Sequence, residues 1–337
     1  MKSLLLKWLP LYAVILVLVL AATLSAQTSD YRISGPVSYK NLSIFLIHGK
    51  NATNKENILT LQEAMERKLF VVYETSDVNE LEVENLSKEF DVFIQSGDIV
   101  KGGKQDRVLA VSIVIPARSG RVSIQAFCVE SGRWTKRGTE DSNKFDSSTD
   151  RIVTKELKIA ANADRSQQEV WNKVTEAQTR LSDSVGSSVS ASESRSSLQL
   201  SLENRQVGAV VDEYIRQLAP AIEGKSDVIG YAFAVNGMIN SADIYLSNTL
   251  FKKVWLKMLK AAATEAVAES RGVRLADAVK AESVKGFIDD GERGATREQA
   301  IGSGARLVTR EDRNNVMFES RDEKSKVVVH KSYVKKQ

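Results

Sequence analysis

Short apolar runs with a two-residue period dominate the first half of the chain, and they constrain its fold most strongly. Leu42, Ile44 and Leu46 alternate with the residues at 43, 45 and 47. Successive side chains of a strand point to opposite faces, so this period predicts a strand and not a helix. Similar runs follow at 69–73, 78–83, 91–95, 107–115 and 121–129. We therefore predict a β-rich part over 31–181, built mostly from antiparallel strands.

Helical patterns are interspersed with these strands and become stronger in the second half. Thr60 followed by Glu63 is a capping-box pattern, which predicts a short helix over 61–68. Apolar residues with a helical period predict the longer helices. These are expected at 167–181, at 207–218 and from a Ser247 N-cap to about residue 262.

A β-hairpin and a terminal pair of strands complete the second half. Asn236-Gly237 separates two apolar runs, and a type I′ turn needs positive φ at both central residues, which Asn and Gly tolerate. The expected strands are 228–235, 238–246, 316–318 and 327–333. The fold class is thus α+β, with 206–337 as an α+β part. Residues 136–149 are expected to form a surface loop, and 182–205 a flexible serine-rich segment.

The first 26 residues have the features of a signal peptide. Lys2 and Lys7 precede an apolar run from Leu9 to Ala22, and small residues then lead to a cleavage site after Ala26. We expect an exported protein, periplasmic or secreted. The alternative is an uncleaved N-terminal membrane anchor, because 8–26 is just long enough to span a thin bilayer. No later stretch is apolar enough for a membrane span.

Charge and cysteine content exclude several classes of protein. The formal net charge is +4, and removal of Lys2 and Lys7 lowers it to +2, so nothing indicates a nucleic-acid partner. Cys128 is the single cysteine, so no intrachain disulfide can form. The sequence gives no protein partner, no cofactor and no metal site. His48, His330 and Cys128 do not form a local set of zinc ligands.

Two glycine-bearing polar motifs, at 102–107 (GGKQDR) and 128–134 (CVESGRW), are the candidate site. Each motif touches a predicted strand, so both can lie at neighbouring strand ends and build a polar pocket. Free backbone amides at the glycines, two guanidinium groups and one carboxylate would bind an anionic or sugar-bearing small molecule. The candidate ligand-binding residues are Gly102, Gly103, Gln105, Arg107, Glu130, Arg133 and Trp134, with Trp134 as a stacking wall.

Two other functions stay open. Glu130 can instead be the general base of a hydrolase, or both motifs can only brace an envelope protein that has no ligand. Other chemistries lack their patterns: Gln105 stands where a phosphate loop needs Ser or Thr, and Cys128 and Arg133 are too close for a cysteine phosphatase loop. No nucleophile elbow supports a Ser-His-Asp triad.

The two motifs, with TLQEA at 60–64 and ELEVEN at 80–85, resemble the ADP-ribosylglycohydrolase and rhodanese-phosphatase-superfamily-associated protein family. The resemblance continues more weakly at 169–172, over 230–243 and in the helix with Trp255, so it covers most of the mature chain. This family is a domain of unknown function. Its name implies a gene-neighbourhood link to ADP-ribose or phosphate chemistry, and hence a ligand class rather than an activity.

Overall fold

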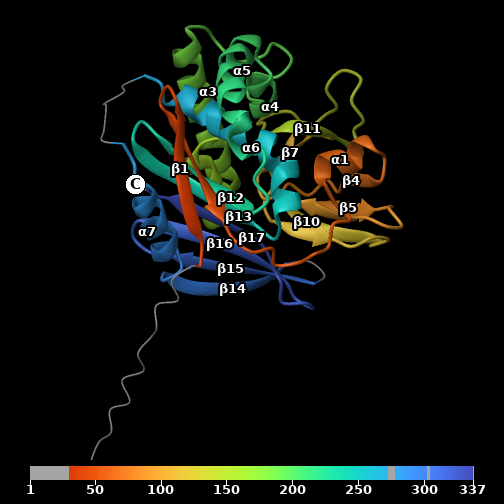
Figure 1. Ribbon diagram of the computed structural model, residues 1–337. Helices are drawn as coiled ribbons and strands as arrows, with labels where there is room; N and C mark the ends of the chain where they lie inside the picture. Colours follow the sequence, from red (N-terminus) through yellow and green to blue (C-terminus); the bar gives the residue numbers. More distant parts are fainter. Residues whose placement is uncertain (1–29, 272–277, 302–303, 337) are drawn as a thin grey trace, which may run out of the picture.

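The computed structural model describes residues 30–271, 278–301 and 304–336. The predicted signal peptide, residues 1–26, lies outside the described residues. The described chain forms one eight-stranded sheet and two smaller sheets, with helices packed around them (Figure 1). The predicted α+β class is confirmed.

The eight-stranded sheet is antiparallel and takes strands from both ends of the chain. Its order is β1-β2-β12-β13-β17-β16-β15-β14. Because β2 pairs with β12, hydrogen bonds of one sheet join the predicted parts 31–181 and 206–337. The predicted terminal pair is confirmed as β16 and β17. The strands are β1 (Arg32–Tyr39), β2 (Leu42–His48), β12 (Val228–Val235), β13 (Met238–Tyr245), β14 (Ala295–Ile301), β15 (Ala305–Glu311), β16 (Asn315–Asp322) and β17 (Val328–Lys335).

Strand β12 is buried along its whole length because helices cover both faces of the sheet. Tyr231 and Phe233 point to one face, where the Tyr231 ring packs edge-on against Trp255 of α6 at 5.6 Å between centroids. Ala232 and Ala234 point to the opposite face and belong to the apolar cluster that contains residues of α7. This arrangement explains the unbroken apolar run of β12. The helices are α6 (Asn248–Ala268) and α7 (Ala281–Gly291).

Local signals in the sequence produce the expected caps and turn. Asn236 and Gly237 have φ of +53° and +76°, which confirms the turn between β12 and β13. Thr60 Oγ1 accepts the Glu63 N–H at 3.2 Å, and Glu63 Oε2 accepts the Thr60 N–H at 2.8 Å, which confirms the capping box. The helix after it is α1 (Leu61–Glu66). Ser247 caps α6 through the Leu250 N–H.

The two smaller sheets hold most strands of the first half, and Figure 1 shows the six-stranded one beside the large sheet. The six-stranded sheet has the order β11-β7-β8-β10-β5-β4, and the three-stranded sheet has the order β3-β6-β9. Their strands are β3 (Ile58–Thr60), β4 (Phe70–Glu74), β5 (Glu80–Asn85), β6 (Asp91–Ile94), β7 (Asp98–Gly102), β8 (Arg107–Leu109), β9 (Ile113–Ile115), β10 (Arg121–Cys128) and β11 (Phe145–Arg151).

Two predictions for this region were wrong in detail, and one strand was missed. The single strand expected at 107–115 is two strands, β8 and β9, which belong to different sheets. The connection between them is buried, so its composition does not differ from that of a strand. The loop expected at 136–149 ends in β11, and β7 was not predicted at all.

The serine-rich segment 182–205 packs against the rest of the protein more closely than predicted. It contains the end of α3 (Gln167–Val185) and the helix α4 (Leu198–Leu202). Ser197, Gln199 and Ser201 are fully buried. Their hydroxyl and amide groups bond to protein partners, so the segment is polar in composition without being a free surface loop.

The remaining helices surround α6 on one side of the large sheet (Figure 1). The predicted helix 207–218 is confirmed as α5 (Arg205–Leu218), and a 3₁₀ turn at Ala219–Ile222 follows it. Helix α2 (Lys155–Ile159) and a π-helical turn at Ala160–Asp164 were not predicted. Among the described residues, no helix has the length and apolar character that crossing a bilayer requires.

Candidate functional site

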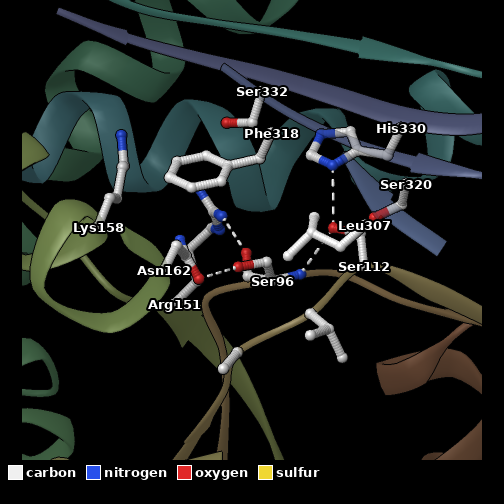
Figure 2. Close-up of a pocket in the computed structure, with 12 residues that line it drawn as sticks. Ser96, Ser112, Arg151, Lys158, Asn162, Leu307, Phe318, Ser320, His330 and Ser332 are labelled. Atoms are coloured by element: carbon white, nitrogen blue, oxygen red, sulfur yellow. Dashed lines mark hydrogen bonds between the residues drawn. The ribbon is translucent and has the colours of Figure 1, made fainter. Parts of the chain in front are cut away.

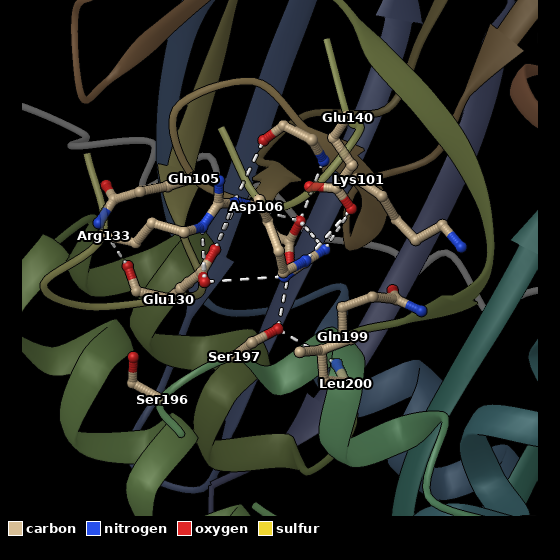
Figure 3. A network of polar contacts seen from close by, with 12 residues as sticks. Lys101, Gln105, Asp106, Glu130, Arg133, Glu140, Ser196, Ser197, Gln199 and Leu200 are labelled. Atoms are coloured by element: carbon tan, nitrogen blue, oxygen red, sulfur yellow. Dashed lines mark hydrogen bonds and ion pairs between the residues drawn. The ribbon is translucent and has the colours of Figure 1, made fainter. Parts of the chain in front are cut away.

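The two glycine-bearing motifs meet because they flank neighbouring strands. β8 pairs with β10, which places Arg107 opposite Cys128 and brings the turn before β8 next to the residues after β10. The Asp106 N–H donates to Glu130 Oε2 at 3.1 Å. Gln105 Nε2 donates to the Glu130 carbonyl at 2.8 Å. Figure 3 shows Asp106, Glu130 and Arg133 directed toward one another.

Glu130 and Arg133 form a buried two-point ion pair. Arg133 Nε lies 2.7 Å from Glu130 Oε1, and Arg133 Nη2 lies 2.6 Å from Glu130 Oε2. Glu130 is 0 % exposed, and burial alone raises the pKa of its carboxyl group. The hydrogen bonds from Arg133, Ser194 and the Asp106 backbone outweigh burial, so the pKa of Glu130 lies below its ordinary value. The carboxylate is held ionised.

A second two-point pair joins Asp106 to Arg137. Arg137 Nη1 lies 2.9 Å from Asp106 Oδ2, and Nη2 lies 3.1 Å from Oδ1. The Ser197 hydroxyl also donates to Oδ2 at 2.9 Å, and the Gly102 N–H donates to Oδ1 at 3.0 Å. Asp106 is 0 % exposed. We call Asp106, Glu130, Arg133 and Arg137 the carboxylate–guanidinium network.

The sequence analysis assigned no role to three residues that bond together here, Asp106, Arg137 and Ser197. Asp106 lies inside the first motif but was not assigned a role, and Arg137 lies three residues beyond the second motif. Ser197 is 91 residues from Asp106, so no spacing rule connects them. The one available signal was the repetition of arginine at 133 and 137 after two motif carboxylates.

Gln105, Asp106 and Glu130 of the two motifs bond to protein groups instead of facing an open pocket. Gln105 and Glu130 are buried, Gln105 Nε2 donates to the Glu130 carbonyl, and both carboxylate oxygens of Glu130 are bonded to the protein. The amide groups expected to face a ligand are also occupied, since the Gly103 N–H donates to the Asp141 carbonyl at 3.0 Å. These contacts favour a bracing role for Glu130 over the predicted general base, because neither carboxylate oxygen is free.

Arg107 points away from the network, which corrects the prediction that it shares a cleft with Arg133. Its Nη1 donates to the Val78 carbonyl at 2.6 Å, and its Nη2 lies 3.2 Å from Glu74 Oε1. Arg107 is 0 % exposed. The Trp134 ring covers this guanidinium at 5.8 Å, with Lys104 at 5.2 Å from the same ring. Trp134 thus stacks on protein cations, and its outer face is exposed.

Immediately outside the network lies an open hollow of about 730 Å³, which we call the outer hollow. Two segments line it, 131–138 after β10 and 193–196 before α4. Counted over the described part of the chain, the lining has four cationic side chains, one carboxylate and no apolar side chain. The lining residues are Ser131, Gly132, Arg133, Thr135, Lys136, Arg137, Gly138, Glu193, Ser194, Arg195 and Ser196.

Comparison with known proteins identifies the family. The family model of the ARG and Rhodanese-Phosphatase-superfamily-associated Protein domain matches residues 30–334. No curated protein and no solved structure matches the chain. The match spans all three sheets and both motifs, so the resemblance seen in the sequence is confirmed. The chain belongs to the ARG and Rhodanese-Phosphatase-superfamily-associated Protein domain family.

Proposed function

We propose that this protein binds a small anionic or sugar-bearing molecule in the outer hollow. The observation that carries the proposal is the composition of the lining, in which every side chain is polar or absent and cations outnumber carboxylates four to one. The volume of about 730 Å³ is within the range of small-molecule sites. The charged groups and hydroxyls of the lining favour a ligand that carries anionic groups or hydroxyls.

The positive charge available to a ligand comes from Lys136 and Arg195. Arg133 and Arg137 are already paired with the carboxylates of the network, and Arg137 also pairs with Glu140 at 2.7 Å. Within the described residues, Lys136 and Arg195 have no carboxylate within 4.0 Å. Both are exposed, and they stand on the two facing segments of the hollow. A ligand with separated anionic groups would contact both.

Hydroxyl groups provide the other contacts that we expect the ligand to make, in addition to those from Lys136 and Arg195. Ser131, Thr135, Ser194 and Ser196 line the hollow and can donate to or accept from ligand hydroxyls. The Ser131 N–H donates to Ser196 Oγ at 3.1 Å, and Ser196 Oγ donates to the Ser131 carbonyl at 2.6 Å. This contact fixes the distance between the two segments. The network below them therefore holds the walls of the site in place before a ligand binds.

Calorimetric titration of the purified chain with ADP-ribose, ribose 5-phosphate and inorganic pyrophosphate tests the proposal. We expect saturable binding of at least one probe, and a loss of about tenfold in affinity in the Lys136→Ala/Arg195→Ala double variant, since two exposed charge contacts are each worth up to about 1 kcal/mol. The matched control is Arg216→Ala/Lys252→Ala, which removes the same charge from exposed helix positions elsewhere. Absence of binding by every probe, or equal affinity of the two double variants, refutes the proposal.

We also propose that the protein is exported after cleavage behind Ala26. The support is the charge and apolar pattern of residues 1–26. N-terminal sequencing of the protein expressed with its leader tests this: a mature chain that begins at Gln27 is the expected result. A chain that keeps residue 1 and sediments with membranes supports the anchor instead.

A further inference from the structure

A second cavity lies against the large sheet, and a serine and a histidine line it. These two residues and a neighbouring carboxylate come from distant parts of the chain. Ser112 Oγ lies 2.9 Å from His330 Nδ1, as Figure 2 shows. His330 Nε2 lies 3.1 Å from Asp243 Oδ1. His330 is on β17, Asp243 is on the adjacent strand β13, and Ser112 lies between β8 and β9. All three residues are buried.

The hydrogen bonds around Ser112 fix the direction in which a proton can move. The Ser96 N–H donates to Ser112 Oγ at 3.0 Å, and the Ser112 hydroxyl can donate its own proton to His330 Nδ1 when the neutral imidazole carries its proton on Nε2 (Figure 2). Burial raises the pKa of Asp243, but the hydrogen bond and charge of His330 outweigh it, and the pKa lies below its ordinary value. An ionised Asp243 accepts a hydrogen bond from Nε2, which places the imidazole proton there and leaves Nδ1 basic.

The surroundings hold the imidazole ring in this orientation. Tyr245 packs against His330 at 4.8 Å between ring centroids, and Phe93 packs edge-on at 6.1 Å. A histidine that is fixed by a buried carboxylate on one nitrogen and hydrogen-bonded to a serine hydroxyl on the other is the arrangement that activates a nucleophilic serine. The roles of the two ring nitrogens are interchangeable in this chemistry, provided the second nitrogen is held as an N–H donor.

We propose that Ser112 is a nucleophile for the hydrolysis of esters of short carboxylic acids, with His330 as general base and Asp243 as its positioning residue. Ser112 Oγ attacks the acyl carbon while its proton passes to His330 Nδ1. The ester C–O bond then breaks, and the leaving alcohol takes that proton. Water then attacks the acyl carbon of the acyl-serine and gives a proton to His330 Nδ1. The bond between the acyl carbon and Ser112 Oγ breaks, the acid is released, and His330 Nδ1 returns its proton to Ser112 Oγ.

The size and lining of the cavity limit the acyl group. The enclosed space beside Ser112 is about 20 Å³, which is room for about one water-sized group, so the lining side chains must move apart to admit even a short acyl group. Arg151 lines the same cavity and is 5 % exposed, and its Nε has no hydrogen-bond partner among the residues that the structure describes. Its other contact, from Nη2 to the Ser96 carbonyl at 2.6 Å, ties it to the segment that holds Ser112. This unused donor can stabilise negative charge that develops on the acyl oxygen.

The chain contains a natural control for this arrangement. Ser34 Oγ lies 2.7 Å from His48 Nε2, and His48 Nδ1 lies 3.0 Å from Asp227 Oδ1. The same three residue types therefore meet twice. Ser34 is on the edge strand β1, and the Asp227 side chain is 55 % exposed and pairs with Arg32 as well. A solvated, shared carboxylate interacts weakly with its histidine, so this second set should not activate its serine.

Two assays on the folded chain test the proposal: p-nitrophenol release from p-nitrophenyl acetate, and covalent modification by methanesulfonyl fluoride mapped by peptide mass spectrometry. We expect Ser112 to be the modified residue. Ser112→Ala should reduce p-nitrophenol release to the background rate, and His330→Gln should slow modification at least about 100-fold. Ser34→Ala, which changes the serine of the second set, should react like the wild type.

Thermal melting of each variant establishes that it is folded. Should Ser112→Ala fail to fold, the mapped site in the wild type decides the matter alone. An unmodified Ser112 in the folded wild type, modification of Ser34 instead, or turnover that persists in folded Ser112→Ala overturns the proposal. The cavity shares no lining residue with the outer hollow, so this result is independent of the proposed ligand binding.

Discussion

Replacement of Gly103 by alanine should destabilise the protein far more than replacement of Gly138, although both glycines have the same backbone conformation. Their φ values are +54° and +55°, in the left-handed region where an alanine side chain costs about 1 kcal/mol. A Cβ at Gly103 would also lie 2.4 Å from Phe145 Cζ and 2.7 Å from Phe145 Cε1. A Cβ at Gly138 would meet nothing within 4 Å.

The difference between the two variants isolates the steric cost. Inserting a methyl group into packed surroundings typically costs about 1–3 kcal/mol, so we expect about 2–4 kcal/mol for Gly103→Ala and about 1 kcal/mol for Gly138→Ala. The displaced ring of Phe145 is the physical cause. Phe145→Leu should therefore destabilise the wild type but recover part of the loss in the Gly103→Ala background.

Urea unfolding of the four proteins of this double-mutant cycle, with Gly138→Ala as the control, measures these free energies. A favourable coupling energy between positions 103 and 145 of about 1 kcal/mol or more is the expected result. Equal costs for the two alanine variants, or a coupling energy of zero, would refute the view that packing against β11 selects glycine at 103. The motif glycine would then need another explanation, such as a ligand that approaches the backbone.

Three further predictions follow from the ion pair, burial and helix cap described above. Glu130→Gln leaves the buried Arg133 without its two-point carboxylate partner and should lower the free energy of unfolding by about 3–5 kcal/mol at neutral pH. Because the pKa of Glu130 is lowered in the folded state, its stabilisation is present above the ordinary pKa of 4.5 and is lost as the pH falls through the folded-state pKa. The wild type and the variant should therefore have converging stabilities in acid unfolding. Burial raises the pKa of Cys128 to about 11, so iodoacetamide at pH 8 should modify it only on unfolding, and rapid native modification would contradict this. Thr60→Ala removes a cap and should cost about 1 kcal/mol in urea unfolding, with a Tm equal to that of the wild type as the contrary result.

Features that depend on a few neighbouring residues could be predicted from the sequence. The turn at Asn236-Gly237 needs only two residues that tolerate positive φ, and the capping box needs only Thr60 and Glu63. The prediction of a single strand over 107–115 was wrong because the segment that interrupts it, 110–112, contains neither glycine nor proline. This segment is also buried like the strands on either side. Tertiary contacts, rather than turn residues, end β8.

The candidate site was predictable only where strand pairing makes distant residues adjacent. The motifs at 102–107 and 128–134 meet because β8 and β10 pair. The apolar alternation of the sequence predicts a strand at both places. Ser112 and His330 are 218 residues apart, and neither lies in a recognisable motif, so their contact depends on how two sheets pack. Residue types alone gave no reason to pair them.

The carboxylate–guanidinium network connects the motifs to the serine-rich segment, and this link explains why polar residues are buried here. Asp106 is the shared element: it is in the turn before β8, it pairs with Arg137 after β10, and it accepts a hydrogen bond from Ser197 at the start of α4. A buried ion pair contributes little net stability compared with apolar packing, but it is costly to leave half-made. Alternative packings of α4 would separate Asp106 from Ser197 and are disfavoured for that reason.

Because 193–196 is one wall of the outer hollow and 131–138 is the other, the network that positions α4 also sets the width of the hollow. Under the proposal, Ser131, Gly132 and Arg133 are the motif residues that line the hollow, and the other motif residues act on it only through its shape.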